Sequence, residues 1–363
     1  MGGMAFPAYI GTGTTDPARR GKDFGERARD GIRRTFDSYL DLFALMGGDD
    51  RAAIRGWGEQ ALHRTALWAP ALADEIAAIA AGADLPAWRI GALNARTEIL
   101  AALRAGNRGE CSTAVALPGR GLPPRTIQTW DWHVRMRHVG VLRAYRPREG
   151  REVRTFTEFG VLAKIGVNSA GLGVHFNILE HTADGDGIGV PVHLVARRIL
   201  DEASTLDEAI GIAADAPVSA SSAITVATYD GREGDARVLE LSPAGLGVVP
   251  PGGDGFLPHT NHFLDPALAP GEWHTDDRPG SHDRLALLRK RSYALASRDP
   301  GLRAGALLSH APGPPVCAHA DPSRPPDEHW ETLATIILDL KDHRLRVHEG
   351  GPCEATPATW QTF

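Results

Sequence analysis

Over roughly the first hundred residues, hydrophobic side chains recur at intervals of three and four positions, the spacing of one buried helix face. In the first such run Phe24, Ile32, Phe36 and Phe43 share a face, and Gly47 follows as a helix end. The pattern predicts four helices before about residue 105, with boundaries good to a few residues. They cover residues 23–46, 50–69, 72–81 and 86–100.

After Cys111 the pattern changes to the alternation of apolar and polar residues that is typical of strands. Strands are predicted at 111–117, 125–132, 139–145, 153–159, 162–167, 172–178, 223–229 and 237–241, with a closing hairpin of 332–340 and 344–348. Helices are expected to begin at Pro191 and at Thr205, and another covers residues 281–297. Antiparallel strands with helices inserted in pairs predict an α+β fold, a sheet-and-helix sandwich in one compact domain with a helical N-terminal part.

Composition narrows the class of protein. Of the 363 residues 42% are hydrophobic, which is enough for a large core, and the net charge of −6 gives no basic patch for a nucleic acid. No apolar run is long enough to span a bilayer, and the first residues lack the basic and apolar regions of a secretory signal. With only three cysteines, the chain has no disulfide framework, so we expect a cytoplasmic protein without membrane or nucleic-acid partners.

No sequence pattern indicates a cofactor or a metal. The glycines near residue 12 lack the spacing and the following helix of a phosphate-binding loop. Fifteen histidines are present, but pairs such as His259 with His262 and His343 with His348 have no partners at metal-ligand spacing. We therefore expect neither.

Cys111 stands where the helical part ends and the first strand begins. A lone cysteine is commonly a buried apolar residue, but one at a strand end after a polar segment is also well placed as a nucleophile. If the bond between Glu110 and Cys111 were cut, the new α-amino group would lie on the same residue as the thiol. The unperturbed pKa of such an amine is about 7.7–8.0, so it can act as the base for its own side chain.

Six short segments around this cysteine resemble one family in the same order along the chain. They are NARTE at 94–98, ECSTA at 110–114, QTWDW at 128–132, EFGVLAKIGVNSAG at 158–171, LELSP at 239–243 and HTNHF at 259–263. The family is the acyl-CoA:6-aminopenicillanic acid acyltransferase (isopenicillin N acyltransferase) group of N-terminal-nucleophile hydrolases, and the similarity extends from about residue 20 to 352.

The resemblance implies an αββα sandwich made as an inactive precursor that cuts itself before the cysteine. Residues 1–110 would become a small helical subunit that stays bound, and residues 111–363 the large subunit. Cys111 would be the nucleophile both of this cleavage and of catalysis, attacking an acyl amide or an acyl-CoA substrate.

The resemblance also implies roles for residues around Cys111. Asp131 would position the new α-amino group, Asn261 would donate its side-chain N–H to the oxyanion, and Ser242 would assist self-cleavage after Glu110. Each has an ordinary structural alternative as well: a solvated strand-end carboxylate, a capped turn and a strand terminus.

Further residues are candidates for contacting the substrate. Trp130 and Trp132 flank Asp131 on one face of a strand and could wall an acyl pocket. Asn168 lies in an Asn-Ser-Ala-Gly run that fits either substrate binding or a plain hairpin turn. The family's arginine after a late cysteine is replaced here by Ala318, so His319 or Arg324 would have to take its place.

Two other functions stay open from the sequence. The family's arginine and a serine are both missing near Cys317, which would also suit a non-catalytic binding protein that keeps the sandwich. Alternatively, the chain could be an unprocessed cysteine hydrolase in which a histidine such as His262 acts as the base.

Overall fold

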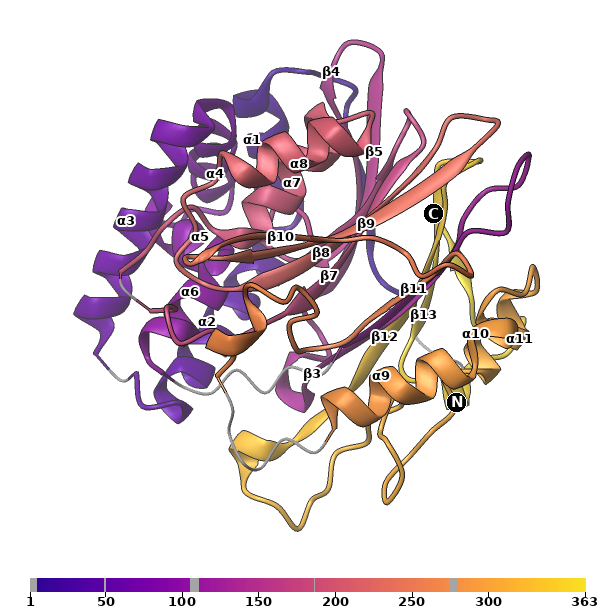
Figure 1. Cartoon of the computed structure of the whole chain (residues 1–363). Helices are drawn as coiled ribbons and strands as arrows, with labels where there is room; N and C mark the ends of the chain where they lie inside the picture. The colour runs from indigo at the N-terminus through magenta and orange to yellow at the C-terminus, as the bar shows by residue number, and fades with distance from the viewer. Residues whose placement is uncertain (1–4, 49, 105–110, 186, 274–279) are drawn as a thin grey trace.

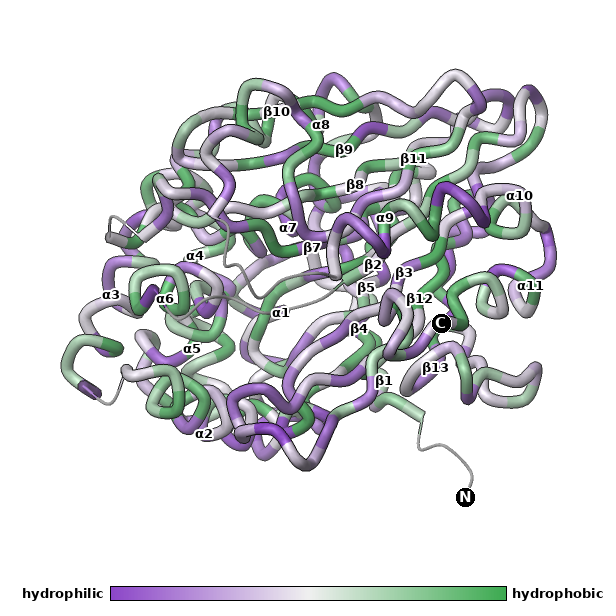
Figure 2. The backbone as a smooth tube through the Cα atoms, turned by 60° about the horizontal axis from the view of Figure 1, so that its bottom comes forward, coloured by the Kyte–Doolittle hydropathy of each residue, from purple (hydrophilic) through white to green (hydrophobic). Residues whose placement is uncertain are grey.

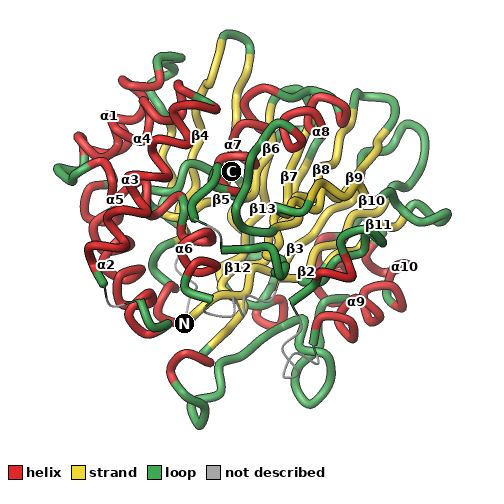
Figure 3. The backbone as a smooth tube through the Cα atoms, turned by 60° about the vertical axis from the view of Figure 1, so that its left-hand side comes forward, coloured by secondary structure: helices red, strands yellow, loops and turns green. Residues whose placement is uncertain are grey.

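The computed structural model describes residues 5–48, 50–104, 111–185, 187–273 and 280–363. Two β-sheets lie face to face, and helices cover the outer side of each, as Figures 1 and 3 show. The predicted α+β sandwich with layers in the order αββα is therefore confirmed.

The larger sheet has eight strands in the order β1-β4-β5-β6-β7-β8-β9-β10. It is antiparallel except where β1 joins β4 in parallel. Its strands are β1 (Ala8–Ile10), β4 (Gly140–Arg148), β5 (Arg151–Glu158), β6 (Ile165–Asn168), β7 (Leu172–Ile178), β8 (Ser222–Tyr229), β9 (Gly234–Ser242) and β10 (Gly245–Val249).

The smaller sheet has six strands in the order β11-β2-β3-β12-β13-β14, all antiparallel. They are β2 (Cys111–Ala116), β3 (Arg125–His133), β11 (Phe256–His259), β12 (Trp330–Asp339), β13 (Arg344–Glu349) and β14 (Gln361–Thr362). The two sheets touch through polar as well as apolar groups: Thr113 of β2 donates to the side-chain oxygen of Asn177 of β7 at 2.7 Å.

Helices of two groups flank the larger sheet. The N-terminal group comprises α1 (Pro17–Arg27), α2 (Arg29–Leu45), α3 (Arg51–Trp68), α4 (Pro70–Gly82), α5 (Ala87–Asn94) and α6 (Arg96–Ala102). The second group is α7 (Val192–Glu202) and α8 (Leu206–Ala214). Figure 2 shows hydrophobic and hydrophilic stretches alternating along the N-terminal helices, as expected for helices with one buried face.

The smaller sheet is covered by α9 (Ser281–Lys290), α10 (Ser292–Leu295) and α11 (Pro300–Gly305). Leu288 and Leu295 of these helices join Ala114 and Ile127 of the sheet in a compact hydrophobic cluster. This cluster fixes the position of α9, the helix that carries Arg284.

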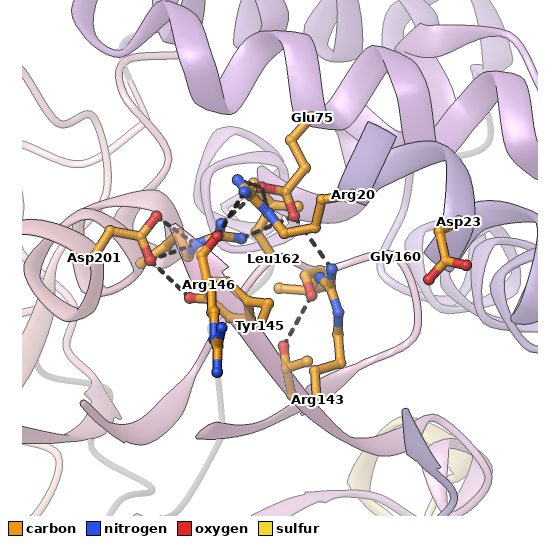
Figure 4. A network of polar contacts seen from close by, with 12 residues as sticks. Arg20, Asp23, Glu75, Arg143, Tyr145, Arg146, Gly160, Leu162 and Asp201 are labelled. Atoms are coloured by element: carbon orange, nitrogen blue, oxygen red, sulfur yellow. Dashed lines mark hydrogen bonds and ion pairs between the residues drawn. The ribbon is translucent and has the colours of Figure 1, made fainter. Parts of the chain in front are cut away.

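A buried ion network joins the N-terminal helices to the rest of the chain (Figure 4). The carboxylate of Glu75 in α4 accepts hydrogen bonds from Arg20 of α1, Arg143 of β4 and Arg197 of α7. All four side chains are buried. The three guanidinium groups hold the pKa of Glu75 well below its usual range against the opposing effect of burial, so the carboxylate stays charged.

The observed elements correct several boundaries. The predicted first helix is two, α1 and α2, because the backbone leaves the helical conformation at Ala28, and the fourth is divided at Ala95 in the same way. The run 281–297 is divided at Arg291. The N-terminal part is not wholly helical, since β1 joins the larger sheet. The elements β10, β11, β14 and α11 were not predicted. Among the described residues, no helix combines the length and apolar character needed to cross a bilayer.

Candidate active site

Cys111 is the first residue of β2, and its backbone is held by three side chains from different parts of the fold. Its N–H donates to Oδ1 of Asn261 at 2.9 Å. Its carbonyl oxygen accepts from Nδ2 of Asn177 at 3.0 Å and from Nη1 of Arg284 at 3.0 Å. Both peptide groups of the residue are thereby fixed without any contact to the sulfur.

The start of α9 supplies and supports two of these contacts. The hydroxyl of Ser281 accepts from the backbone N–H of Asn261 at 2.8 Å and lies 2.7 Å from Nδ1 of His262. Arg284 follows three positions later on the same helix face, so one element both fixes the Asn261 turn and brings a guanidinium to Cys111. The same guanidinium bonds Oδ1 of Asn261 at 3.1 Å.

The hydrogen bonds determine which way the Asn261 amide points. Oδ1 faces two groups that only donate, the Cys111 N–H and Arg284, while Nδ2 donates to the carbonyl oxygen of Ile178 at 2.8 Å. Asn261 thus lies beside Cys111, as predicted, but presents its oxygen to it. The side-chain N–H that was expected to donate to an oxyanion donates to Ile178 in this arrangement, and its role in the cleaved protein stays a prediction.

The electrostatic surroundings keep the Cys111 thiol protonated. Burial raises the pKa of the thiol to about 12, and the nearby Asp131 carboxylate adds to the rise. Lys164 and Arg284 oppose it with positive charge but do not cancel it. A group that accepts the thiol proton is therefore needed before the sulfur can attack.

Lys164 is a buried amine whose charge is coupled to that thiol. Its Nζ lies 2.7 Å from Oε2 of Glu158 and 3.6 Å from the centre of the Trp130 ring. Burial lowers the pKa of Lys164 to about 7, even though the Glu158 carboxylate favours its charged form. Arg96 also pairs with Glu158 and helps hold the pKa of that carboxyl at about 2, so the carboxylate is shared between two cations.

Asp131 lies on β3, fully buried, in register with Thr332 of β12. Strand alternation places its side chain on the face of β3 opposite to that of Trp130, the residue in register with Cys111. The carboxylate is nevertheless close enough to raise the pKa of the Cys111 thiol.

Trp130 and Trp132 belong to the core. They are 4% and 1% exposed; Trp130 packs edge-on against Phe156, and Trp132 packs in the same way against Trp330. Neither ring lines the solvent-open cleft described below, so a role in an acyl pocket stays a prediction.

Asn168 is the last residue of β6, beside the start of β7. Its Nδ2 donates to the carbonyl oxygens of Leu200 and Ala203, and its Oδ1 accepts from the N–H groups of Ala170 and Leu172. β7 separates it from Ile178 by about 20 Å. The structure thus corrects its assignment to substrate binding: the amide closes a hairpin.

Ser242 ends β9, where its hydroxyl accepts from the N–H of Ala244 at 3.2 Å. The preceding residue, Leu241, is level with Ile178 across two steps of the sheet, about 10 Å away. Ser242 thus lies at the same end of the larger sheet as Asn261. Glu110, predicted to precede the cleavage point, lies outside the described residues.

Neither proposed substitute for the family arginine points to Cys111. His319 contacts two other cysteines, Cys317 and Cys353, and Arg324 forms an exposed ion pair with Glu328 at 2.8 Å. The guanidinium beside Cys111 is that of Arg284. Arg284 and Asn177 were not predicted from the sequence, because no short motif surrounds them. Lys164 was not predicted either, although it lies in one of the six segments.

His262 does not fit the role of a base for Cys111. Its Nδ1 is engaged by Ser281, and its ring lies against that of His282 with the centres 3.8 Å apart. Burial lowers the pKa of His262 to about 3, and neighbouring cationic groups reinforce the shift. The imidazole therefore acts as a support for the Asn261 turn.

A cleft opens one residue beyond Ile178. It is open to solvent, and Cys111 is not among the residues that line it. Its apolar wall is formed by Leu100, Ala101, Leu179, Ala220 and Trp273. Arg104, Glu180, His181 and Asp184 supply polar groups to the same cleft.

Comparison with solved structures gives distant similarities. An N-acylethanolamine-hydrolyzing acid amidase ortholog from Caenorhabditis elegans has a TM-score of 0.43 at 15% identity, over 64% of this chain and 96% of that one. Penicillin V acylase from Agrobacterium tumefaciens has a TM-score of 0.39 at 14% sequence identity, over 66% of this chain and 83% of that one. A mutant conjugated bile acid hydrolase from Clostridium perfringens has a TM-score of 0.40 at 12% sequence identity, over 69% of this chain and 92% of that one.

Comparison of sequences gives a higher identity than these structural similarities. A curated relative from Emericella nidulans, acyl-coenzyme A:6-aminopenicillanic-acid-acyltransferase 40 kDa form, is 30% identical over 195 residues, 54% of this chain and 52% of the relative. The chain spans about half the length of that relative. The family model described as acyl-coenzyme A:6-aminopenicillanic acid acyl-transferase matches residues 126–354, which begin after Cys111. The chain belongs to the acyl-coenzyme A:6-aminopenicillanic acid acyl-transferase family.

Proposed function

We propose that the chain is a self-processing N-terminal cysteine amidohydrolase or acyltransferase with Cys111 as its nucleophile. The observation that carries the proposal is the way Cys111 is held: Asn261, Asn177 and Arg284 fix its N–H and carbonyl at the start of β2. Membership of an acyltransferase family makes acyl transfer through a thiol the chemistry to test.

Self-cleavage begins with attack of the Cys111 sulfur on the carbonyl carbon of Glu110. The thiol proton goes to a base, the carbon–nitrogen bond breaks, and the nitrogen of Cys111 takes up a proton as it becomes an α-amine. Water then hydrolyses the thioester, releasing the Glu110 carboxyl group and restoring the thiol.

The base for this first step must already exist in the uncut chain, when Cys111 has no α-amine. Lys164 suits the role because its pKa of about 7 leaves it largely neutral just above neutral pH, and its charge is coupled to the thiol. We propose Lys164 for self-cleavage and the new α-amine for turnover.

In the mature protein the Cys111 α-amine keeps Asn261 Oδ1 as its hydrogen-bond acceptor. Asp131 would bias the amine by its charge, as a positioning residue. The amine then accepts the thiol proton, the sulfur attacks a substrate carbonyl, and an acyl-enzyme forms with loss of an amine or thiol. Water or a second amine removes the acyl group.

The cleft beyond Ile178 suits the acyl group. Leu100, Leu179 and Trp273 offer an apolar wall, and Arg104 and His181 offer polar contacts for the leaving group. We therefore propose a small acyl amide or acyl thioester as the substrate. A test panel includes an acyl-CoA and 6-aminopenicillanic acid, after the name of the fungal relative.

Intact-mass spectrometry with N-terminal sequencing tests the proposal. We expect two chains from the wild type, the larger beginning Cys-Ser-Thr-Ala, and a single chain from Cys111→Ala. Cys111→Ser is the matched control, since it keeps a nucleophile of nearly the same size and should cleave slowly rather than not at all.

Activity is then scored on the cleaved protein with the panel of amides and thioesters. A burst of acyl-enzyme on Cys111, seen as an added acyl mass, supports an enzyme. A wild-type chain that stays intact on prolonged incubation contradicts self-processing. A cleaved chain that binds members of the panel without ever forming the acyl-enzyme indicates the non-catalytic binding protein instead.

A further inference from the structure

Four potential metal ligands converge beside β12, where Ala318 is hydrogen-bonded to Thr332. They are His310, Cys317, His319 and Cys353, and their ligand atoms all lie within 4.8 Å of one another. They come from three separate places in the chain. Among the described residues this is the one group of three or more such side chains placed to share an ion.

Two distances within the cluster match a tetrahedral metal. Nε2 of His319 lies 3.7 Å from Sγ of Cys317 and 3.4 Å from Sγ of Cys353. With metal–sulfur bonds of 2.3 Å and metal–nitrogen bonds of 2.0–2.1 Å, a tetrahedral site separates these atoms by about 3.5 Å. A thiol–imidazole hydrogen bond would explain one such pair, but not the convergence of all four groups.

The backbone leaves room for the sulfurs. A Cβ placed on Gly351 would come within 2.7 Å of Sγ of Cys317 and 3.7 Å of Sγ of Cys353. The φ of Gly351 is −75°, which any residue adopts, so the glycine is needed here for space and not for conformation. The N–H of Cys317 donates to the carbonyl oxygen of Ser309 at 3.0 Å, which closes the loop that also carries His310.

We propose that His310, Cys317, His319 and Cys353 bind one divalent zinc ion as a structural site. Two thiolates and two imidazoles in tetrahedral array are the ligand set that zinc prefers, and four protein ligands leave no open position for a substrate. This site is independent of the proposed acyl transfer at Cys111. It also replaces the expectation from sequence that the chain binds no metal.

The zinc would fasten a long irregular segment to the smaller sheet. Ala318, between two ligands, exchanges hydrogen bonds with Thr332: its N–H donates to the Thr332 hydroxyl at 2.9 Å, and its oxygen accepts from the Thr332 N–H at 3.0 Å. Thr332 is in register with Asp131 on β3. The metal thus ties residues 310–319 and 353 to the strand beside Asp131.

Elemental analysis of the purified full chain tests the site. We expect about one zinc per chain. In chain depleted of metal by a chelator, added cobalt(II) should produce the thiolate-to-cobalt charge-transfer absorption of a sulfur-ligated site. Cys353→Ser and His319→Ala should weaken zinc binding at least about tenfold. Both residues are exposed, so their loss should not prevent folding, and circular dichroism checks this.

Cys111→Ser is the matched control: it removes a cysteine outside the cluster and should keep the full zinc content. The proposal is overturned if the reduced, folded, metal-free chain takes up neither zinc nor cobalt. It is equally overturned if both ligand variants bind zinc as tightly as the wild type, or if thiol counting shows a Cys317–Cys353 disulfide in the purified chain. None of these results depends on whether the chain cleaves itself.

Discussion

At the scale of single residues, Cys111 is held through its backbone, whereas its sulfur stays buried and protonated. The groups that hold it are two amides and one guanidinium, which act through hydrogen bonds. The groups that can change the state of the sulfur, Lys164 and Asp131, act through charge. Positioning and proton transfer are thus assigned to different side chains, and each can be tested separately.

Removing the Arg284 guanidinium should slow self-cleavage. Arg284→Met deletes a donor to the Cys111 carbonyl and a bond to Asn261, so both the nucleophile and its partner shift. A displacement of about 1 Å costs about 10²-fold in rate, and we expect a loss of this size. The time course of precursor loss by mass spectrometry measures it.

Arg289→Met is the control for that change, because Arg289 is exposed on the same helix. This variant should cleave itself at the wild-type rate. Equal rates for the two variants would show that Arg284 has no part in positioning Cys111.

The pH dependence of the self-cleavage rate should follow the protonation state of the Lys164 amine. Below a pH of about 7 the amine carries a proton and cannot accept one from the thiol, so the rate should rise with pH and level off above about 7. Precursor refolded from denaturant on either side of this value, and sampled by mass spectrometry, gives the profile. Lys164→Met should lose the bend near 7; a wild-type profile that is flat there would exclude Lys164 as the base.

At the scale of elements, the N-terminal helices pack by bringing glycine against backbone. A Cβ on Gly58 of α3 would lie 2.3 Å from the carbonyl oxygen of Trp88 in α5, and one on Gly25 of α1 would lie 2.3 Å from that of Ile79 in α4. Distances below 3.0 Å force the partners apart. These helix pairs are therefore closer than side chains would allow.

Two glycines of α3 provide a matched test of this packing. Gly58→Ala should destabilise the chain by about 1–3 kcal/mol, because α3 and α5 must separate. Gly56→Ala, two positions earlier, meets nothing within 4 Å and should stabilise by about 0.5–1 kcal/mol through helix propensity. Urea unfolding measures both. Changes of the same sign in the two variants would contradict the packing argument.

The elements also show what sequence patterns predict. Most helices were found from their periodicity, because each long helix buries one face. The strands were found as apolar or alternating runs, although central strands such as β2 and β7 are buried on both faces. The breaks at Ala28 and Ala95 were missed since alanine favours helices, and it is tertiary packing that ends them there. The short strands β1 and β14 were missed because partners distant in sequence define them.

The residues of the candidate site also fall into those that short motifs predict and those that only the fold brings together. Cys111 and Asn261 were found through short motifs, and the structure brings them together. Arg284 was not predicted because only the docking of α9 on the smaller sheet carries it to Cys111. The zinc ligands His310 and Cys353 are separated by 42 intervening residues, so no local spacing marks them.

At the scale of the whole molecule, residues 5–104 are built into the rest of the chain through buried charge. Glu75 accepts from Arg20 of its own segment and from Arg143 and Arg197 of the later chain. Arg96 of the N-terminal segment likewise forms an ion pair with Glu158 of the later chain. If the Glu110–Cys111 bond is cut, these contacts remain. We therefore expect the two pieces to co-purify.

Glu75→Gln should weaken that association. Three buried guanidinium groups lose their shared carboxylate, and breaking a buried pair costs about 3–5 kcal/mol. Urea unfolding and size-exclusion chromatography of the cleaved protein should show lower stability and earlier separation of the pieces. Glu59→Gln, which removes an exposed pair with Arg55 on one helix, is the control and should change little. Equal stability of the two variants would contradict this role for Glu75.

The small strand β1 gives the N-terminal segment one more significance. It pairs with β4 at the end of the larger sheet, so the edge that would otherwise offer free N–H and C=O groups is covered by the part of the chain that cleavage would detach. After cleavage the protein would be an obligate heterodimer sharing one sheet. Its smaller partner would then protect the larger one from aggregation for the lifetime of the assembly.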